Sequence, residues 1–219
     1  MLPIEEKAPA GARIWRWTTG PLENNVYLVA DQEGNAAIID PGIESEQALG
    51  WTRQNGFKLA WILITHGHFD HVFRAAFFAR ATHAGIAISE ADAELLLHMK
   101  DAAAIWGFQA EDPPQPPDLL LNDGDEIHIG SLTVRAVATP GHSPGSMCFL
   151  LDGFMFVGDT LFAGSVGRTD LPGGSQESLM CSLRDRLLSL PGETVIYPGH
   201  GPITTVAREK SSNPFLAGR

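Results

Sequence analysis

The chain has 219 residues, of which 44% are apolar and 19% charged, so it can bury a substantial core and is not expected to be disordered. Its formal net charge of −11 and pI near 5.0 argue against a nucleic-acid partner, which would require a basic face. The same charge would repel an anionic substrate, unless bound divalent cations reversed the field locally.

Short strands and helices alternate along the first half of the chain. Apolar patterning predicts strands at 13–17, 26–30, 36–39, 61–65 and 86–88. Helical spacing predicts helices at 44–55, 72–83 and 91–106. WILIT at 61–65 is apolar until its last residue, which indicates a strand that is buried on both faces.

The second half begins with a proline-rich segment, EDPPQPPD at 111–118, which cannot continue a helix and is predicted to be an extended surface loop. Strands are then predicted at 126–129, 132–138, 147–151, 154–157 and 195–197, with an amphipathic helix at 179–190. Each half therefore runs from strands to a helix and carries a histidine-bearing loop. This order predicts two similar halves in one sandwich, and we expect a single domain over 1–219.

The cellular setting is predicted from what the sequence carries at its cysteines and its N-terminus. Cys148 and Cys181 lie in apolar segments without the spacing of a zinc knuckle or redox pair, so we expect buried free thiols and a reducing compartment. MLPIEEKAPAGA does not resemble a secretory signal, and no apolar run approaches the roughly 20 residues that span a bilayer. We therefore expect a soluble, cytoplasmic protein with no membrane partner.

The sequence THGHFDH at 65–71 places three histidines and an aspartate directly after the apolar strand. A loop can direct His66 and His68 to one ion, whereas Asp70 and His71 start the next helix and point to a neighbouring position. The carboxyl end of a buried strand is where sites are often built in layered α/β proteins. The alternative interpretation is a solvated polar loop with a histidine at a helix start.

Three later stretches carry one ligand-type residue each. His142 lies in the tight turn of TPGHSPGS, Asp159 follows the strand in FVGDTLF, and His200 ends the last strand in IYPGHGP. Each could be an ordinary turn residue, but three such turns together with THGHFDH are improbable by coincidence. The remaining histidines lie in helical or strand stretches, where surface or structural side chains are the preferred interpretation. They are His83, His98 and His128.

The pattern HxHxDH, followed by a lone His, Asp and His that each end a strand, resembles the metallo-β-lactamase superfamily. GRTD at 167–170 and PGHGP at 198–202 resemble its short glyoxalase II-like members, the hydroxyacylglutathione hydrolase-like enzymes. The resemblance runs from GPLENNVYLV and IDPG to NPFL at 213–216. It implies an α+β fold, a four-layer αβ/βα sandwich of two mixed β-sheets flanked by helices. It also implies that the C-terminal helical glutathione-binding domain of full-length glyoxalase II is missing.

The resemblance further implies two divalent metal ions, with zinc expected first and iron or manganese as alternatives. It assigns His66, His68 and His142 to the first metal, Asp70, His71 and His200 to the second, and Asp159 to a bridging position shared with a hydroxide. Asp70 would also orient that nucleophile or transfer a proton. Asp40 of IIDPG would support the histidines from behind, unless it only forms a turn. Thr65 and Thr160 could give similar support, or be simple strand-end hydroxyls.

The implied activity is hydrolysis of a small-molecule thioester of the S-acylglutathione class, since a metal-bridging hydroxide needs no serine or cysteine nucleophile. Arg168-Thr169-Asp170 replaces a Lys-Phe-Tyr loop of the family, so Arg168 would bind a substrate carboxylate or only pair with Asp170. Trp106 and Phe108, with loop 111–118, would form a substrate wall or a packed surface excursion. The alternative functions are a mononuclear iron persulfide dioxygenase, a lactonase or other ester hydrolase, a non-catalytic scaffold and a diiron redox module.

Overall fold

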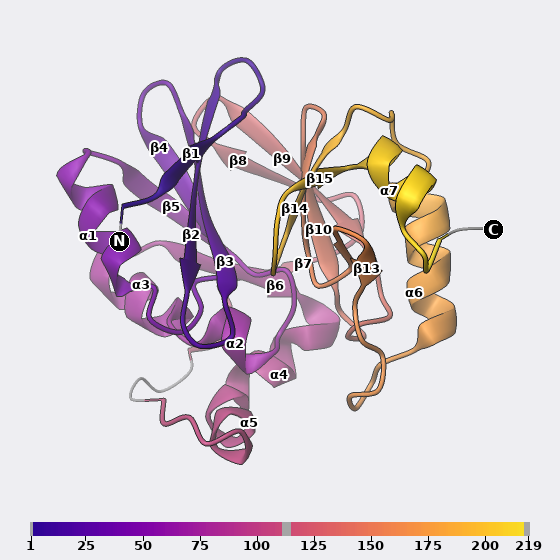
Figure 1. Ribbon diagram of the computed structural model, residues 1–219. Coiled ribbons are helices and arrows are strands. Elements are labelled where there is room, and N and C mark those ends of the chain that lie inside the picture. Colours follow the sequence, from indigo (N-terminus) through magenta and orange to yellow (C-terminus); the bar gives the residue numbers. More distant parts are fainter. Residues whose placement is uncertain (1, 111–114, 217–219) are drawn as a thin grey trace.

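Two β-sheets stacked face to face form the centre of the computed structural model, which describes residues 2–110 and 115–216 (Figure 1). The first sheet contains, in spatial order, β1 (Ile4–Glu6), β2 (Ala12–Thr19), β3 (Asn24–Asp31), β4 (Asn35–Ile39), β5 (Lys58–Leu63), β6 (Gly85–Ser89) and β7 (Leu119–Leu121). Its strands pair antiparallel from β1 to β4 and parallel from β4 to β7. The sheet is therefore mixed.

The second sheet contains, in spatial order, β15 (Thr204–Thr205), β14 (Val195–Pro198), β11 (Phe154–Gly158), β10 (Met147–Leu151), β9 (Leu132–Ala138) and β8 (Glu126–Ile129). It is also mixed, because β11 and β14 are parallel whereas the other neighbours are antiparallel. A separate hairpin consists of β12 (Leu161–Phe162) and β13 (Ser165–Val166).

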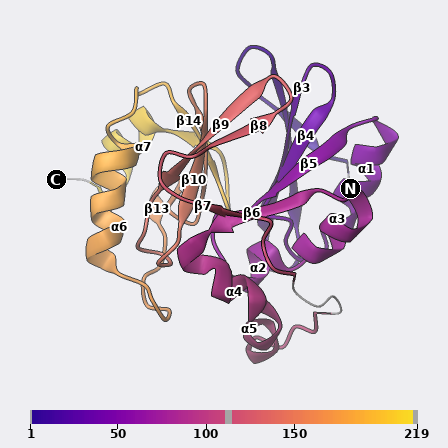
Figure 2. The same ribbon diagram turned by 180° about the vertical axis from the view of Figure 1, so that it is seen from behind.

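Helices cover the outer face of each sheet, as the two opposite views show (Figures 1 and 2). On the side of the first sheet lie α1 (Glu46–Gln54), α2 (Phe69–Val72), α3 (Ala75–Thr82), the 3-10 turn η1 (Glu90–Asp92), α4 (Ala93–Leu97) and α5 (Met99–Ile105). On the side of the second sheet lie α6 (Gln176–Ser182), its π-helical continuation η2 (Leu183–Leu187) and α7 (Val206–Ser212). Within the described part of the chain, no helix is both long and apolar enough to cross a membrane.

Three apolar clusters hold these layers together. One lies between the two sheets and includes Tyr27, Leu63 and Phe156. The other two lie between each sheet and its own helices, with Phe78 in one and Leu183 in the other. The predicted four-layer αβ/βα sandwich of two mixed sheets is therefore confirmed.

Two helices of the first half differ from their predicted bounds. The predicted helix 72–83 is observed as α3, but its first residue, Val72, ends α2, and the Arg74 backbone N–H bonds to Pro41 O at 2.9 Å instead of continuing α2. The predicted helix 91–106 is divided into η1, α4 and α5. Of the two cysteines, which are both free, Cys148 is buried as predicted but Cys181 is only half-buried. The prediction of a fully buried Cys181 was therefore wrong.

Candidate metal centre

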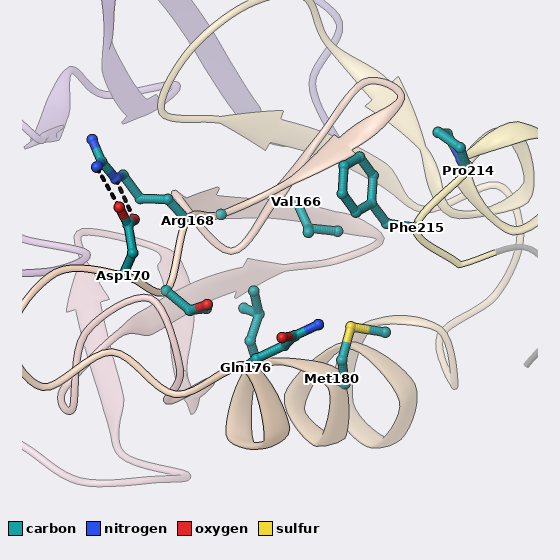
Figure 3. Close-up of a pocket in the computed structure, with 10 residues that line it drawn as sticks. Val166, Arg168, Asp170, Gln176, Met180, Pro214 and Phe215 are labelled. Atoms are coloured by element: carbon teal, nitrogen blue, oxygen red, sulfur yellow. Dashed lines mark hydrogen bonds and ion pairs between the residues drawn. The ribbon is translucent and has the colours of Figure 1, made fainter.

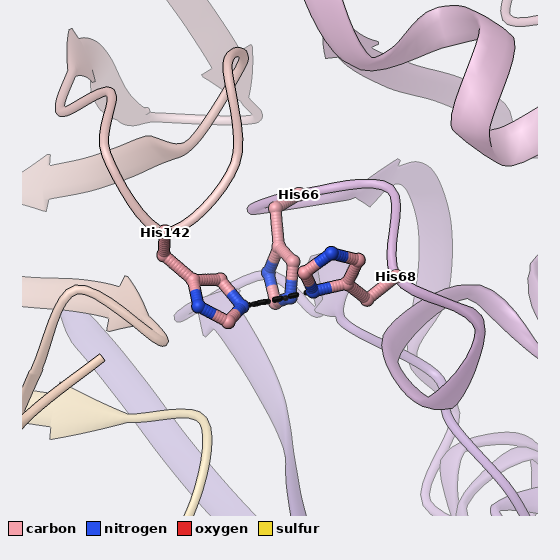
Figure 4. Close-up of side chains that lie close together, drawn as sticks. All are labelled: His66, His68 and His142. Atoms are coloured by element: carbon pink, nitrogen blue, oxygen red, sulfur yellow. Dashed lines mark hydrogen bonds between the residues drawn. The ribbon is translucent and has the colours of Figure 1, made fainter. Parts of the chain in front are cut away.

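Three imidazoles from two distant loops converge where the two sheets meet (Figure 4). His66 and His68 lie between β5 and α2, and His142 lies in the turn between β9 and β10. His142 Nε2 lies 3.2 Å from His66 Nε2 and 2.9 Å from His68 Nδ1. Ring nitrogens this close can share one cation. The structure thus brings together the three histidines assigned to the first metal, while their role as ligands stays a prediction.

A second cluster joins the start of α2 to the segment after β14. His71 Nε2 lies 3.3 Å from His200 Nε2 and 3.5 Å from Asp70 Oδ2. His200 Nε2 is also 3.5 Å from Asp70 Oδ2. His71 is fully buried, whereas Asp70 and His200 are partly exposed. The three residues assigned to the second metal therefore also meet, on the side of the centre that is accessible to solvent.

Asp159, which follows β11, lies between the two clusters. Its Oδ1 is 3.4 Å from His71 Nε2, while its Oδ2 is 3.6 Å from His142 Nε2 and 3.7 Å from His200 Nε2. Oδ1 is buried and has no hydrogen-bond partner among the described residues. A carboxylate oxygen left in this state is costly unless a cation faces it. This position fits the bridging assignment.

Four histidines each form a hydrogen bond through the ring nitrogen that points away from the centre. Their other ring nitrogen therefore faces the centre. His142 Nδ1 donates to the carbonyl of Arg168 at 2.8 Å, and His200 Nδ1 donates to the carbonyl of Leu22 at 2.9 Å. Because a carbonyl only accepts, Nδ1 of each ring carries a proton, so the lone pair of the neutral ring lies on Nε2. Such lone pairs are what a metal ion requires.

Asp40 and Thr65 fix the other two rings in the same way. Asp40 Oδ2 accepts from His71 Nδ1 at 3.0 Å and from Thr65 Oγ1 at 2.6 Å. Since the Thr65 hydroxyl proton is used in that bond, Thr65 Oγ1 accepts from His66 Nδ1 at 3.1 Å. Thr160 bonds to Thr139 and Cys148 instead, so it does not contact the histidines through these bonds. The support expected from Asp40 and Thr65 is thus present in the hydrogen bonds, and none is seen from Thr160.

The pKa values of the histidines shift in opposite directions in the two clusters. Burial lowers the pKa of His66 well below its usual value and that of His68 to about 4, helped by the neighbouring imidazoles. Burial also opposes charge on His71, yet the carboxylates of Asp159 and Asp70 raise its pKa to about 10. In a metal-free protein His71 would therefore carry the positive charge that the aspartates require, which is the place a metal ion would take.

The backbone around the second cluster is shaped to let the donors approach one another. A Cβ at Gly199 would stand 2.7 Å from His71 Cε1 and closer still to Asp159 Oδ1. Only glycine therefore fits between the His200 loop and these two side chains. Together with the unpartnered Asp159 oxygen and the imidazole nitrogens that face the centre, this fit supports the binding of divalent metal. Imidazole and carboxylate donors suit zinc, iron(II) or manganese.

Beside this centre lies a cavity of about 640 Å³ lined by Val166, Arg168, Gln176, Met180 and Phe215, among others (Figure 3). The Arg168 guanidinium donates to both oxygens of Asp170, at 2.7 and 2.8 Å, and both side chains are exposed. The structural pairing of Arg168 with Asp170 is thus observed, and a role of Arg168 in substrate binding stays a prediction.

The aromatic residues proposed as a substrate wall pack against the metal-site loop. Phe69 lies between His68 and Asp70, with ring centroids 6.3 Å from Trp106 and 5.6 Å from Phe108. Trp106 is 55% exposed and could meet a ligand. Of the proline-rich segment 111–118, residues 111–114 lie outside the described residues. The three histidines predicted to be ordinary, His83, His98 and His128, are all exposed and belong to none of the ligand clusters.

Sequence reasoning missed the polar residues that start β3. Asn24 is fully buried and donates to Asp70 Oδ2 at 3.1 Å. Asn25 donates from its side chain to the carbonyls of Pro198 and Gly201, at 3.0 and 2.8 Å. These bonds hold Asp70 and the loop that carries His200. The signal was two adjacent amides at the head of a strand that is otherwise apolar up to Asp31.

The four-layer sandwich and its paired histidine–aspartate clusters define a metal-binding protein whose centre lies where the two sheets meet. The model of the metallo-beta-lactamase superfamily matches residues 19–200, and the chain belongs to this superfamily. It is 37% identical over 200 residues to hydroxyacylglutathione hydrolase GloC of Haemophilus influenzae, covering 89% of this chain and 93% of that protein.

Two solved structures are also similar to this chain. The di-iron-bound form of TTHA1623 has a TM-score of 0.84 and 42% identity, covering 92% of this chain and 99% of that one. The B3 metallo-beta-lactamase BLEG-1 has a TM-score of 0.87 and 32% identity, covering 94% and 100%.

Proposed function

We propose that this protein is a metal-dependent thioester hydrolase that acts on S-acylglutathione-type substrates with two divalent cations. The observation that carries the proposal is the placement of Asp159, whose carboxylate lies 3.6 Å from His142 of the first cluster and 3.4 and 3.7 Å from His71 and His200 of the second. A bridging carboxylate of this kind is what joins two ligand sets into one dinuclear centre. The likeness to hydroxyacylglutathione hydrolase GloC supports the substrate class.

The residues of the chain would each perform a simple task. Four of the five imidazoles would hold the cations through the nitrogen that faces the centre, since their other nitrogen is engaged by Thr65, Asp40 or a backbone carbonyl. The chemistry that two such cations supply is the activation of water near neutral pH and the polarisation of a carbonyl. Asp70, which accepts a hydrogen bond from Asn24, would orient the attacking water.

The chemistry of the leaving group supports a thioester over an ordinary ester. Burial opposes ionisation of Asp70, but His71 and His200, each 3.5 Å away, hold its pKa below the usual value, so Asp70 is a poor proton donor. An alkoxide leaving group needs a proton from a general acid, whereas a thiolate leaves without one because a thiol has a pKa of about 8.5. The centre therefore suits substrates whose product is a thiol.

The proposal is tested by metal analysis of the purified protein together with two activity assays. We expect two metal ions per chain and release of free thiol from S-lactoylglutathione, followed with a thiol reagent. The competing function is a mononuclear iron persulfide dioxygenase, and the iron in the similar TTHA1623 structure makes iron loading a realistic outcome. One iron per chain, with oxygen consumed on addition of glutathione persulfide and no thioester hydrolysis, would overturn the hydrolase proposal.

A further inference from the structure

A buried carboxylate outside the two ligand clusters connects the loops that carry the first three histidines. Asp92 ends the η1 turn, immediately before α4, and has no exposed surface. Its Oδ2 accepts from the Gly67 backbone N–H at 2.9 Å and from Ser143 Oγ at 2.6 Å. Its Oδ1 accepts from the Gly145 backbone N–H at 2.7 Å. A carboxylate removed from water is retained at such a site only when donors surround it in this way.

The three donors come from two segments that are far apart in sequence. Gly67 lies between His66 and His68, and Ser143 directly follows His142. A single side chain is thus bonded to both loops whose imidazoles converge (Figure 4). A change in the position of this carboxylate would shift one loop relative to the other.

The glycines of these loops permit the close approach. A Cβ at Gly67 would stand 2.8 Å from Asp92 O, and a Cβ at Gly145 would stand 2.7 Å from Asp92 Cγ. Ser146 extends the network, because its Oγ accepts from the Ser143 backbone N–H at 3.0 Å and lies 2.7 Å from Ser143 Oγ. With the Ser143 proton given to Asp92, the Ser146 hydroxyl donates to Ser143, so each hydroxyl in the chain has a partner.

The geometry points to Asp92 as a positioning residue, which fixes the distance between the His142 loop and the His66–His68 loop. Its hydrogen bonds reach no imidazole nitrogen, so it acts through the backbone and the serine beside the histidines. The expected consequence is a specific loss of metal affinity at one of the two sites when its carboxylate is altered. The inference rests on the metal centre of the proposed function but not on its substrate.

The test compares Asp92→Asn with Asp31→Asn as a matched control. Asp31 is equally buried and accepts from the backbone N–H groups of Glu33, Asn35 and Ser131, at 2.9, 2.9 and 3.0 Å. It lies at the end of β3 and contacts neither ligand loop through these bonds. Both variants remove one buried acceptor charge, so they separate an effect on the metal centre from a general effect on stability.

Zinc affinities are measured by titrating the metal-free protein in competition with a chromophoric chelator, and the stability of the same metal-free protein is measured by thermal denaturation. We expect Asp92→Asn to weaken one of two zinc sites by about tenfold or more, the range known for groups that orient metal ligands. Asp31→Asn should keep both affinities while losing thermal stability. If Asp92→Asn does not fold, Ser143→Ala removes a single donor and should weaken the same site.

Equal zinc affinities in wild type and Asp92→Asn, or an equal loss in Asp92→Asn and Asp31→Asn, would show that Asp92 only stabilises the fold. Less than one zinc ion per wild-type chain would overturn the inference together with the metal centre. Two zinc ions per chain without thioester hydrolysis would overturn the proposed substrate alone, and the comparison of the two variants would still decide the role of Asp92.

Discussion

Asp40→Ala should destabilise the metal-free protein far more than an ordinary truncation, because three buried donors lose their acceptor. Asp40 is 2% exposed and accepts from the Thr65 backbone N–H at 2.8 Å, from Thr65 Oγ1 at 2.6 Å and from His71 Nδ1 at 3.0 Å. A buried donor left unpaired costs about 1–3 kcal/mol, and losses within one network are not additive, so we expect about 3–5 kcal/mol. The φ of 49° at Asp40 adds to this, since alanine tolerates it less well than aspartate.

The assay is urea denaturation of the metal-free protein, followed by circular dichroism and extrapolated to water. Asp40→Asn is the matched control, because asparagine tolerates the same φ and keeps one oxygen that can accept from the Thr65 backbone N–H. Its stability should lie between those of wild type and Asp40→Ala. An alanine variant within about 1 kcal/mol of wild type would refute the reasoning, because the three donors would then have found other partners.

Three further predictions address the second cluster and the acid range. His200→Ala removes one donor of that cluster, so metal content should fall toward one ion per chain and thioester hydrolysis by about 100-fold or more; unchanged hydrolysis would exclude a dinuclear mechanism. Gly199→Ala places a methyl group 2.7 Å from His71 Cε1, so it should weaken zinc binding in a titration, whereas wild-type affinity would show that the loop can move aside. Burial raises the pKa of Asp31, but hydrogen bonds from the Asn35 side chain and three backbone amides together lower it from 3.8 to about 2. Because this folded value is below the unfolded one, its stabilisation is present above about pH 4 and lost as the pH falls toward 2. The stability difference between wild type and Asp31→Asn in urea should shrink over that interval, and a constant difference would contradict the assignment.

The parts of the fold that were predictable are those with a local signal. The apolar run before THGHFDH indicated the buried strand that became β5, and the leucine spacing of 179–190 indicated the helix that became α6 and η2. Strands of two or three residues, such as β7, β12, β13 and β15, are too short to show a period and were missed. The break between α2 and α3 depends on a bond from Arg74 to Pro41, which no local pattern contains.

The candidate site also has a part that could be predicted from the sequence and a part that could not. Histidines and aspartates at strand ends could be found because imidazoles and carboxylates are typical metal ligands and their turns are rich in glycine. The residues that hold these ligands could not be found from the sequence, because Asp92 bonds to Gly67 and Ser143, which lie 25 and 51 residues away along the chain. A signal existed: Asp92 lies on the buried stripe of its helical segment with Leu96 and Met99, at positions where an apolar side chain is expected.

The polar side chains that hold the ligand loops explain how a metal centre can lie between two sheets that share no strand. Asp40 binds Thr65 and His71 from the first sheet, and Asp92 joins that loop to the His142 loop of the second. Asn25 at the start of β3 donates to Pro198 and thereby fixes the loop before His200. Each connection is made by a polar side chain to groups that are buried and bonded without a metal ion. The ligand loops are thus held in place by the fold itself, so a cation entering the centre would meet donors already set at their distances instead of ordering them on arrival.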